Sequence, residues 1–210
     1  MNDLTTPHAG QIAPADNRSM PPSVILKRYL GINLLCRGSL GEMLQFNSAF
    51  VRFEDERRYS NLDQGEALKR ALDAAEALPS GEDLRAMQST LTTALERTAT
   101  QAEISKITAA LCDAIPTFDP MKAPGYLDAL LFVLETENSV EPFCPQAIAG
   151  AVYRLMKSER FAPNPDTLLE AIREEVERYT AWRHRVEVTL TSLAKLADFR
   201  AEAAKQMSAS

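Results

Sequence analysis

The sequence predicts an all-α protein, a multi-helix bundle with a disordered N-terminal tail and a long C-terminal helix. Its 210 residues contain 8 glycines, about half of average usage, while the helix formers Ala, Leu and Glu are plentiful. Five successive segments begin with residues that cap a helix, and apolar positions recur at helical spacing. With 45% hydrophobic residues in 23.2 kDa, the chain has enough apolar material for a real core.

The first segment, residues 1–22, predicts a disordered tail. It contains four prolines and no apolar run, and it has Asp3 where a secretory signal would carry basic residues. The longest apolar run, Ala129–Leu134, is far shorter than the roughly 20 residues of a membrane span. The three cysteines are widely spaced in apolar contexts, which is typical of reduced thiols. We therefore expect a soluble, cytoplasmic protein without membrane contact.

The next segment, residues 23–116, predicts an N-terminal helical region of five helices. A helix begins at Ser23, and the capping box Ser39–Glu42 predicts the start of a second one that ends near residues 54–58. Each of the other three has a capping signal at its start, and Pro79 stops the first of them. These signals are Asp63–Glu66, Ser80–Asp83 and Thr100–Glu103.

A loop with three prolines, at 116–125, is the best candidate for a boundary between this region and a C-terminal helical region, residues 123–206. Tyr126–Thr136 is apolar nearly all round and predicts a central buried helix. Another helix begins at Pro145, and Asn164 with Pro165 forms a good start for the last one.

The last helix is expected to run from Pro165 to about Lys205. Its apolar stripe covers 28 residues in eight steps, a mean of 3.5. The stripe fits either packing against the protein's own bundle or a coiled-coil seam that docks a partner or forms a homodimer. Arg185–Thr191 also alternates as a strand would, but the helical pattern on both sides favours a helix. The stripe consists of Leu169, Ile172, Val176, Tyr179, Trp182, Val186, Leu190, Leu193 and Ala197.

Catalytic and cofactor signatures are missing from the sequence. It has no GxxxxGK[ST], GxGxxG, HExxH or CxxC motif, and its two histidines, His8 and His184, have no metal-ligating neighbours at helical spacing. The carboxylates of Glu170, Glu174 and Glu177 have arginines at helical spacing, which indicates a solvated, salt-bridged face. We expect a protein that is not an enzyme and that has no catalytic, cofactor or metal site.

Two features bear on nucleic acid, although the net charge of -6 argues against a protein that wraps a phosphate backbone. Thr100–Ile107 is similar to the first helix of a helix-turn-helix, but Thr108–Ala114 continues the same helix instead of forming the turn. The second feature is a small basic and aromatic cluster, which suits a solvated edge, an acidic protein partner or single-stranded DNA. Its residues are Tyr153, Arg154, Lys157, Arg160 and Phe161.

Residues 103–179 carry a family resemblance. An amphipathic helix ends in Ala114-Ile-Pro, a proline loop follows, and Gly125-Tyr-Leu-Asp-Ala-Leu-Leu opens the next helix. Pro145-Gln-Ala-Ile-Ala-Gly-Ala-Val-Tyr-Arg and Arg160-Phe-Ala-Pro-Asn-Pro come next. This order resembles the small helical domain of phage and prophage replication accessory proteins, the loaders or organisers of the replicative helicase. The chain departs from them in its structured residues before Glu103 and in its apolar C-terminal helix.

The resemblance implies a non-enzymatic adaptor that binds a replicative helicase or an initiator without using nucleotide. It also implies that Tyr153, Arg154, Lys157, Arg160 and Phe161 belong to the contact surface. Two alternatives remain open at this point: a self-assembling helical scaffold protein, and a DNA-binding regulator that uses Thr100–Ala114.

Overall fold

The computed structural model describes residues 22–59, 64–114, 123–158 and 163–208, and these form seven α-helices and no strand. The all-α fold class and the long C-terminal helix are confirmed. The predicted tail, residues 1–22, lies outside the described residues except for Pro22. The helices are α1 (Pro22–Tyr59), α2 (Gln64–Glu76), α3 (Gly81–Glu96), α4 (Gln101–Ala114), α5 (Ala123–Val140), α6 (Pro145–Ser158) and α7 (Pro165–Ser208).

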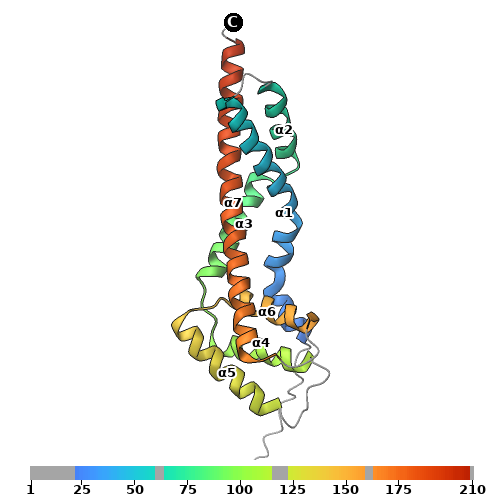
Figure 1. Cartoon of the computed structure of the whole chain (residues 1–210), viewed down its shortest axis with the longest axis vertical. Coiled ribbons are helices and arrows are strands. Elements are labelled where there is room, and N and C mark those ends of the chain that lie inside the picture. The colour runs from blue at the N-terminus through green and yellow to red at the C-terminus, as the bar shows by residue number, and fades with distance from the viewer. Residues whose placement is uncertain (1–21, 60–63, 115–122, 159–162, 209–210) are drawn as a thin grey trace, which may run out of the picture.

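The molecule has a stalk and a base (Figure 1). In the stalk, α1 and α7 run in the same direction away from the base, while α2 and then α3 run back towards it. The α2 helix packs on α1, and α3 packs on α7. At the base, α4, α5 and α6 surround the first turns of α1 and α7. At 1.5 Å per residue the 44 residues of α7 extend about 66 Å, which accounts for the elongated shape.

The predicted helix start at Ser39–Glu42 is wrong, because α1 continues through these residues without a break. The buried side chains of α1 keep one face across the site: Cys36 is followed two turns later by Met43. Continuity of this stripe lets α1 contribute to both the base and the stalk, and that packing outweighs the local capping signal. Buried residues of the stripe are Leu26, Tyr29, Ile32, Cys36, Met43, Phe46, Phe50 and Phe53.

The other capping signals within the described residues form as predicted. The Ser80 hydroxyl accepts a hydrogen bond of 3.1 Å from the backbone N–H of Asp83. Thr100 and Glu103 form the reciprocal capping box, since each backbone N–H donates to the other's side chain, at 3.1 and 3.3 Å. Asn164 Oδ1 accepts from Thr167 N–H at 2.7 Å and thus fixes the start of α7.

The prediction that Tyr126–Thr136 forms the central buried helix is wrong. Helix α5 lies at the edge of the base, where Phe132 is 72% exposed and only one side of the helix, with Leu130 and Leu134, is buried. The central helix is α6, which packs on α1, α4 and α7. Its run of small residues allows close approach on several sides, whereas the larger side chains of α5 exceed what one packed face can bury. This run is Ala147, Ala149, Gly150 and Ala151, all buried.

Two apolar clusters hold the molecule together. The larger one occupies the base and the lower stalk and takes residues from both predicted regions, 23–116 and 123–206. The smaller one, in the upper stalk, is built around Phe46, Phe50 and Phe53 with Leu196 of α7. The predicted stripe of α7 packs within these clusters, with Ala197 exposed at its end.

Candidate partner-binding groove

Three residues of the predicted cluster lie on the outer side of α6. The side chain of Tyr153 is 36% exposed, and Lys157, one turn later, places its Nζ 4.3 Å from the centre of the Tyr153 ring. Arg154 instead turns towards α7 and donates to the backbone oxygen of Ala171 at 3.3 Å. Arg154 and Lys157 thus line the same groove, but the surroundings of their side chains differ.

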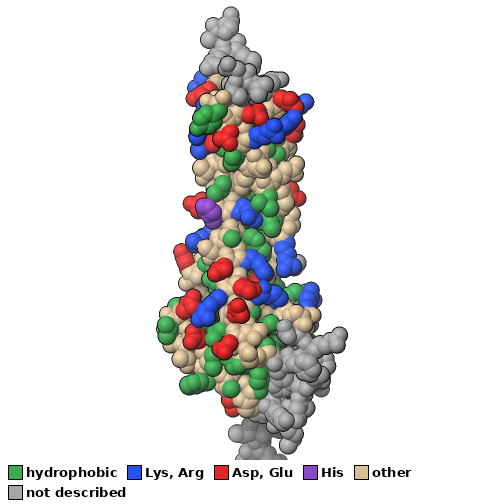
Figure 2. Space-filling model, viewed as in Figure 1, with side chains coloured by type: hydrophobic (Ala, Val, Ile, Leu, Met, Phe, Trp, Pro, Cys, Tyr) green, Lys and Arg blue, Asp and Glu red, His purple; other side chains and the backbone are tan. Residues whose placement is uncertain are grey.

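The groove lies between α6 and the facing sides of α1 and α7, at the level where the stalk meets the base. It has two adjoining compartments, of ≈310 and ≈360 Å³, which share Asn33, Arg37 and Tyr153. Figure 2 shows basic side chains close together on this part of the surface, with acidic ones between and below them. Among the described lining residues, Glu175 is acidic and five are basic: Lys27, Arg37, Arg154, Lys157 and Arg178.

Two of the basic side chains are held by the wall of the groove. Glu175 of α7 is 1% exposed, and its Oε1 accepts from Arg178 at 2.6 Å and lies 3.9 Å from Nε of Arg154. Arg154 is also ion-paired with Glu174. The burial of a carboxylate requires such partners, since an isolated charge loses its hydration. Arg154 and Arg178 are therefore engaged mainly in stabilising the buried carboxylate of Glu175, and they are less available to a ligand.

Arg37 and Lys157 differ from these two. Both are exposed, and neither forms an ion pair with any residue that the structure describes. They lie on different helices, α1 and α6, and line the same compartment. Together with Lys27, which lines only the other compartment, they are the basic side chains of the groove for which no ion pair is formed among the described residues.

The remaining predicted cluster residues, Arg160 and Phe161, lie outside the described residues. The prediction missed Arg37 and Arg178. Arg37 had no visible signal, because it precedes the point where the sequence predicted a break in α1. Arg178 was assigned to a salt-bridged face of the last helix, and it does form a salt bridge, but with Glu175.

The charged face of α7 forms ion pairs to other helices as well as within α7. Arg173 donates to Glu137 in the last turn of α5 and to Glu141, which directly follows the helix, both at 3.1 Å. These bonds fasten the end of α5 to α7. Arg173 of α7 therefore serves the packing of the base.

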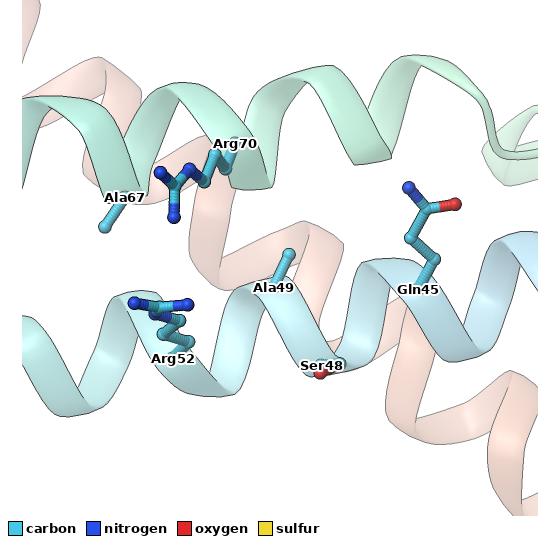
Figure 3. Close-up of a pocket in the computed structure, with 6 residues that line it drawn as sticks. All are labelled: Gln45, Ser48, Ala49, Arg52, Ala67 and Arg70. Atoms are coloured by element: carbon cyan, nitrogen blue, oxygen red, sulfur yellow. The ribbon is translucent and has the colours of Figure 1, made fainter.

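A second hollow, between α1 and α2, has a different character (Figure 3). It has a volume of ≈240 Å³ and includes two arginines. Arg52 pairs with Glu56, one turn along α1, and Arg70 pairs with Glu66, one turn earlier on α2. Since each charge is balanced on its own helix, this hollow offers less to a charged partner than the groove beside α6.

Other chemistry is sparse in the described part of the chain. No group of three or more His, Cys, Asp or Glu side chains there is arranged to hold a metal ion. Cys36 and Cys144 are buried and Cys112 is half-buried, all as free thiols. Burial raises the pKa of Cys36 and of Cys112 to about 11, so both are protonated at neutral pH. None of the described helices combines the length and the apolar character needed to cross a bilayer.

The chain was compared with protein families, curated proteins and solved structures. No family model matches the chain, and neither the curated proteins nor the solved structures contain a significant match.

Proposed function

We propose that this protein is a non-enzymatic adaptor of phage or prophage DNA replication, which binds a replicative helicase or an initiator without using nucleotide. The observation that carries the proposal is the groove beside α6, where Tyr153 and Lys157 stand exposed next to Arg37. Tyr and Arg are the residues that most often dominate protein interfaces.

The residues that resemble replication accessory proteins, 103–179, support the same proposal. They correspond to α4, α5, α6 and the first turns of α7, which together make up most of the base. The stalk, formed mainly by the residues without such a counterpart, holds the base at one end of a long rod. In this arrangement the base makes the contact, and the stalk acts as a spacer or as a second contact.

The experiment is size-exclusion chromatography of the purified protein with the purified replicative helicase of its host. The proposal expects a shared peak that is lost in Tyr153→Ala/Lys157→Glu and kept in the matched control Lys69→Glu, whose exposed lysine lies on α2 in the stalk. If the wild-type protein and the helicase elute separately at micromolar concentration, the helicase is not the partner. Repeating the run with the replication initiator then tests the second partner of the same proposal.

A second candidate is a self-assembling scaffold protein. Its support is a shallow groove along the stalk between α1 and α7, which is lined by the exposed apolar residues Val51 and Val188. The stripe of α7 predicted as a seam packs mainly inside the protein, so a homodimer would use this groove instead. Light scattering at high concentration decides: a mass of 23.2 kDa contradicts assembly, and twice that mass supports it.

A further inference from the structure

We propose that the groove beside α6 binds an acidic peptide segment that carries a bulky apolar side chain. This inference rests on the proposed function in taking the partner to be a protein, and it specifies which part of that partner is recognised. It follows from the juxtaposition of an apolar compartment with a basic one along a single groove.

The apolar compartment has the size and the walls of a side-chain pocket. Leu26, which is 2% exposed, lies at its base, and the half-buried Leu30 and Met156 form walls from α1 and α6. Its volume of ≈310 Å³ accommodates one large aliphatic or aromatic side chain. Methionine adapts its shape to the group it contacts, which suits a wall that receives an anchor residue.

The basic compartment begins where the apolar one ends, because Arg37 and Tyr153 line both. Arg37 and Lys157 have no acidic partner among the described residues, and the arginine fork can bind a carboxylate through two hydrogen bonds. A peptide that places its apolar side chain against Leu30 would therefore bring adjacent carboxylates to these two cations. Lys27, at the far side of the apolar compartment, offers a third cation to the peptide.

The same features favour an acidic peptide over nucleic acid. Single-stranded DNA is held by aromatic faces that stack on bases, together with a run of cations along the backbone. Here the Lys157 ammonium covers one face of Tyr153, and two of the five basic side chains are tied to Glu174 and Glu175. The net charge of -6 also opposes a polyanion as long as a nucleic acid, whereas a short acidic segment needs only the local charges.

The test uses the full chain and a fluorescein-labelled peptide of four aspartates followed by leucine and phenylalanine, with binding measured by fluorescence anisotropy. We expect binding that weakens as salt rises and that falls about tenfold or more in Arg37→Glu/Lys157→Glu. The matched control is Lys69→Glu/Lys106→Glu, which changes two exposed lysines on α2 and α4 and should retain the affinity within about twofold. Circular dichroism verifies that both variants are folded.

Two further peptides test the two compartments separately. Replacing the aspartates by asparagines, or leucine and phenylalanine by serines, should each reduce affinity by about tenfold. The inference is overturned if the wild-type protein does not bind the acidic peptide, if the groove variant binds it as tightly, or if oligothymidylate of the same charge binds more tightly in the groove. A helicase complex that forms while this peptide fails to bind would contradict the inference alone. Peptide binding without a complex with either the helicase or the initiator would contradict the proposed function alone.

Discussion

Gly150 of α6 directly faces the buried carboxylate of Glu175 on α7. A Cβ atom placed on Gly150 would lie 3.0 Å from Oε2 and 3.2 Å from Cδ of Glu175. The carboxylate has little freedom to move away, because it is 1% exposed and is held by Arg178 at 2.6 Å. The close packing of these two helices, which forms one wall of the groove, therefore depends on glycine at position 150.

This relationship predicts a coupling between the two residues. Gly150→Ala should lower the free energy of unfolding by about 1 kcal/mol, since overpacking outweighs the helix propensity gained by alanine. In a Glu175→Ala background the same substitution should raise it, because the obstructing side chain is absent. A double-mutant cycle by urea denaturation measures the coupling, and additive effects would contradict it.

The continuity of α1 gives a second prediction. Ser39 lies inside a helix rather than at its start, so Ser39→Ala should leave stability unchanged or raise it by a few tenths of a kcal/mol. The matched control is Ser80→Ala, which removes a real N-cap and should cost about 1 kcal/mol. Equal losses of stability in the two variants would instead show that Ser39 caps a helix and that α1 is interrupted there, as the sequence predicted.

The peripheral place of α5 is tested by two residues on opposite sides of that helix. Phe132→Asp should change stability by less than about 0.5 kcal/mol, because this side chain is 72% exposed. Leu130→Ala should cost about 2–5 kcal/mol, since its side chain is fully buried. Thermal and urea unfolding of both variants provide the measurement, and a large loss in Phe132→Asp would place α5 in the centre after all.

Substitutions of Arg154 and Lys157 should differ in their effect on stability, because Arg154 supports the wall of the groove and Lys157 does not. Arg154→Ala removes a partner of Glu174 and Glu175, and should lower the free energy of unfolding by about 1–2 kcal/mol. Lys157→Ala should leave stability within about 0.5 kcal/mol, since Lys157 is exposed and, among the described residues, its ammonium lies over the partly exposed Tyr153 ring without an ion pair. Urea denaturation compares the two, and similar stabilities would show that the wall does not need Arg154.

Alkaline pH should destabilise the protein through its buried thiols. Burial raises the pKa of Cys36 from 9.0 to about 11, so the folded state keeps a proton that the unfolded state has already released. The stability contributed by this group is complete below pH 9 and is lost as the pH rises to about 11, at no more than about 1.4 kcal/mol per pH unit. In Cys36→Ala the slope between these pH values should be shallower, while an unchanged slope would exclude Cys36 as the cause.

Features that depend on local contacts and on periodicity could be predicted from the residues alone. Ser80, Thr100 and Asn164 cap helices because their partners are only three residues away, and a hydrogen bond over that distance needs no tertiary support. The long apolar stripe of α7 likewise predicted one continuous helix. The cluster that includes Tyr153, Arg154 and Lys157 was predicted from residue types and spacing on a helix that the pattern already indicated.

Which helix signals prevail, and which surfaces come together, depends on packing between helices that are distant in sequence. The cap at Ser39 does not form, because packing of α1 over two clusters stabilises a continuous helix more than one capping bond would. The small residues of α6, rather than the larger ones of α5, fill the centre, because close approach of several helices requires little side-chain volume. Arg37 and Tyr153 are more than a hundred residues apart in the sequence but line the same groove, and no local pattern could indicate that they come together.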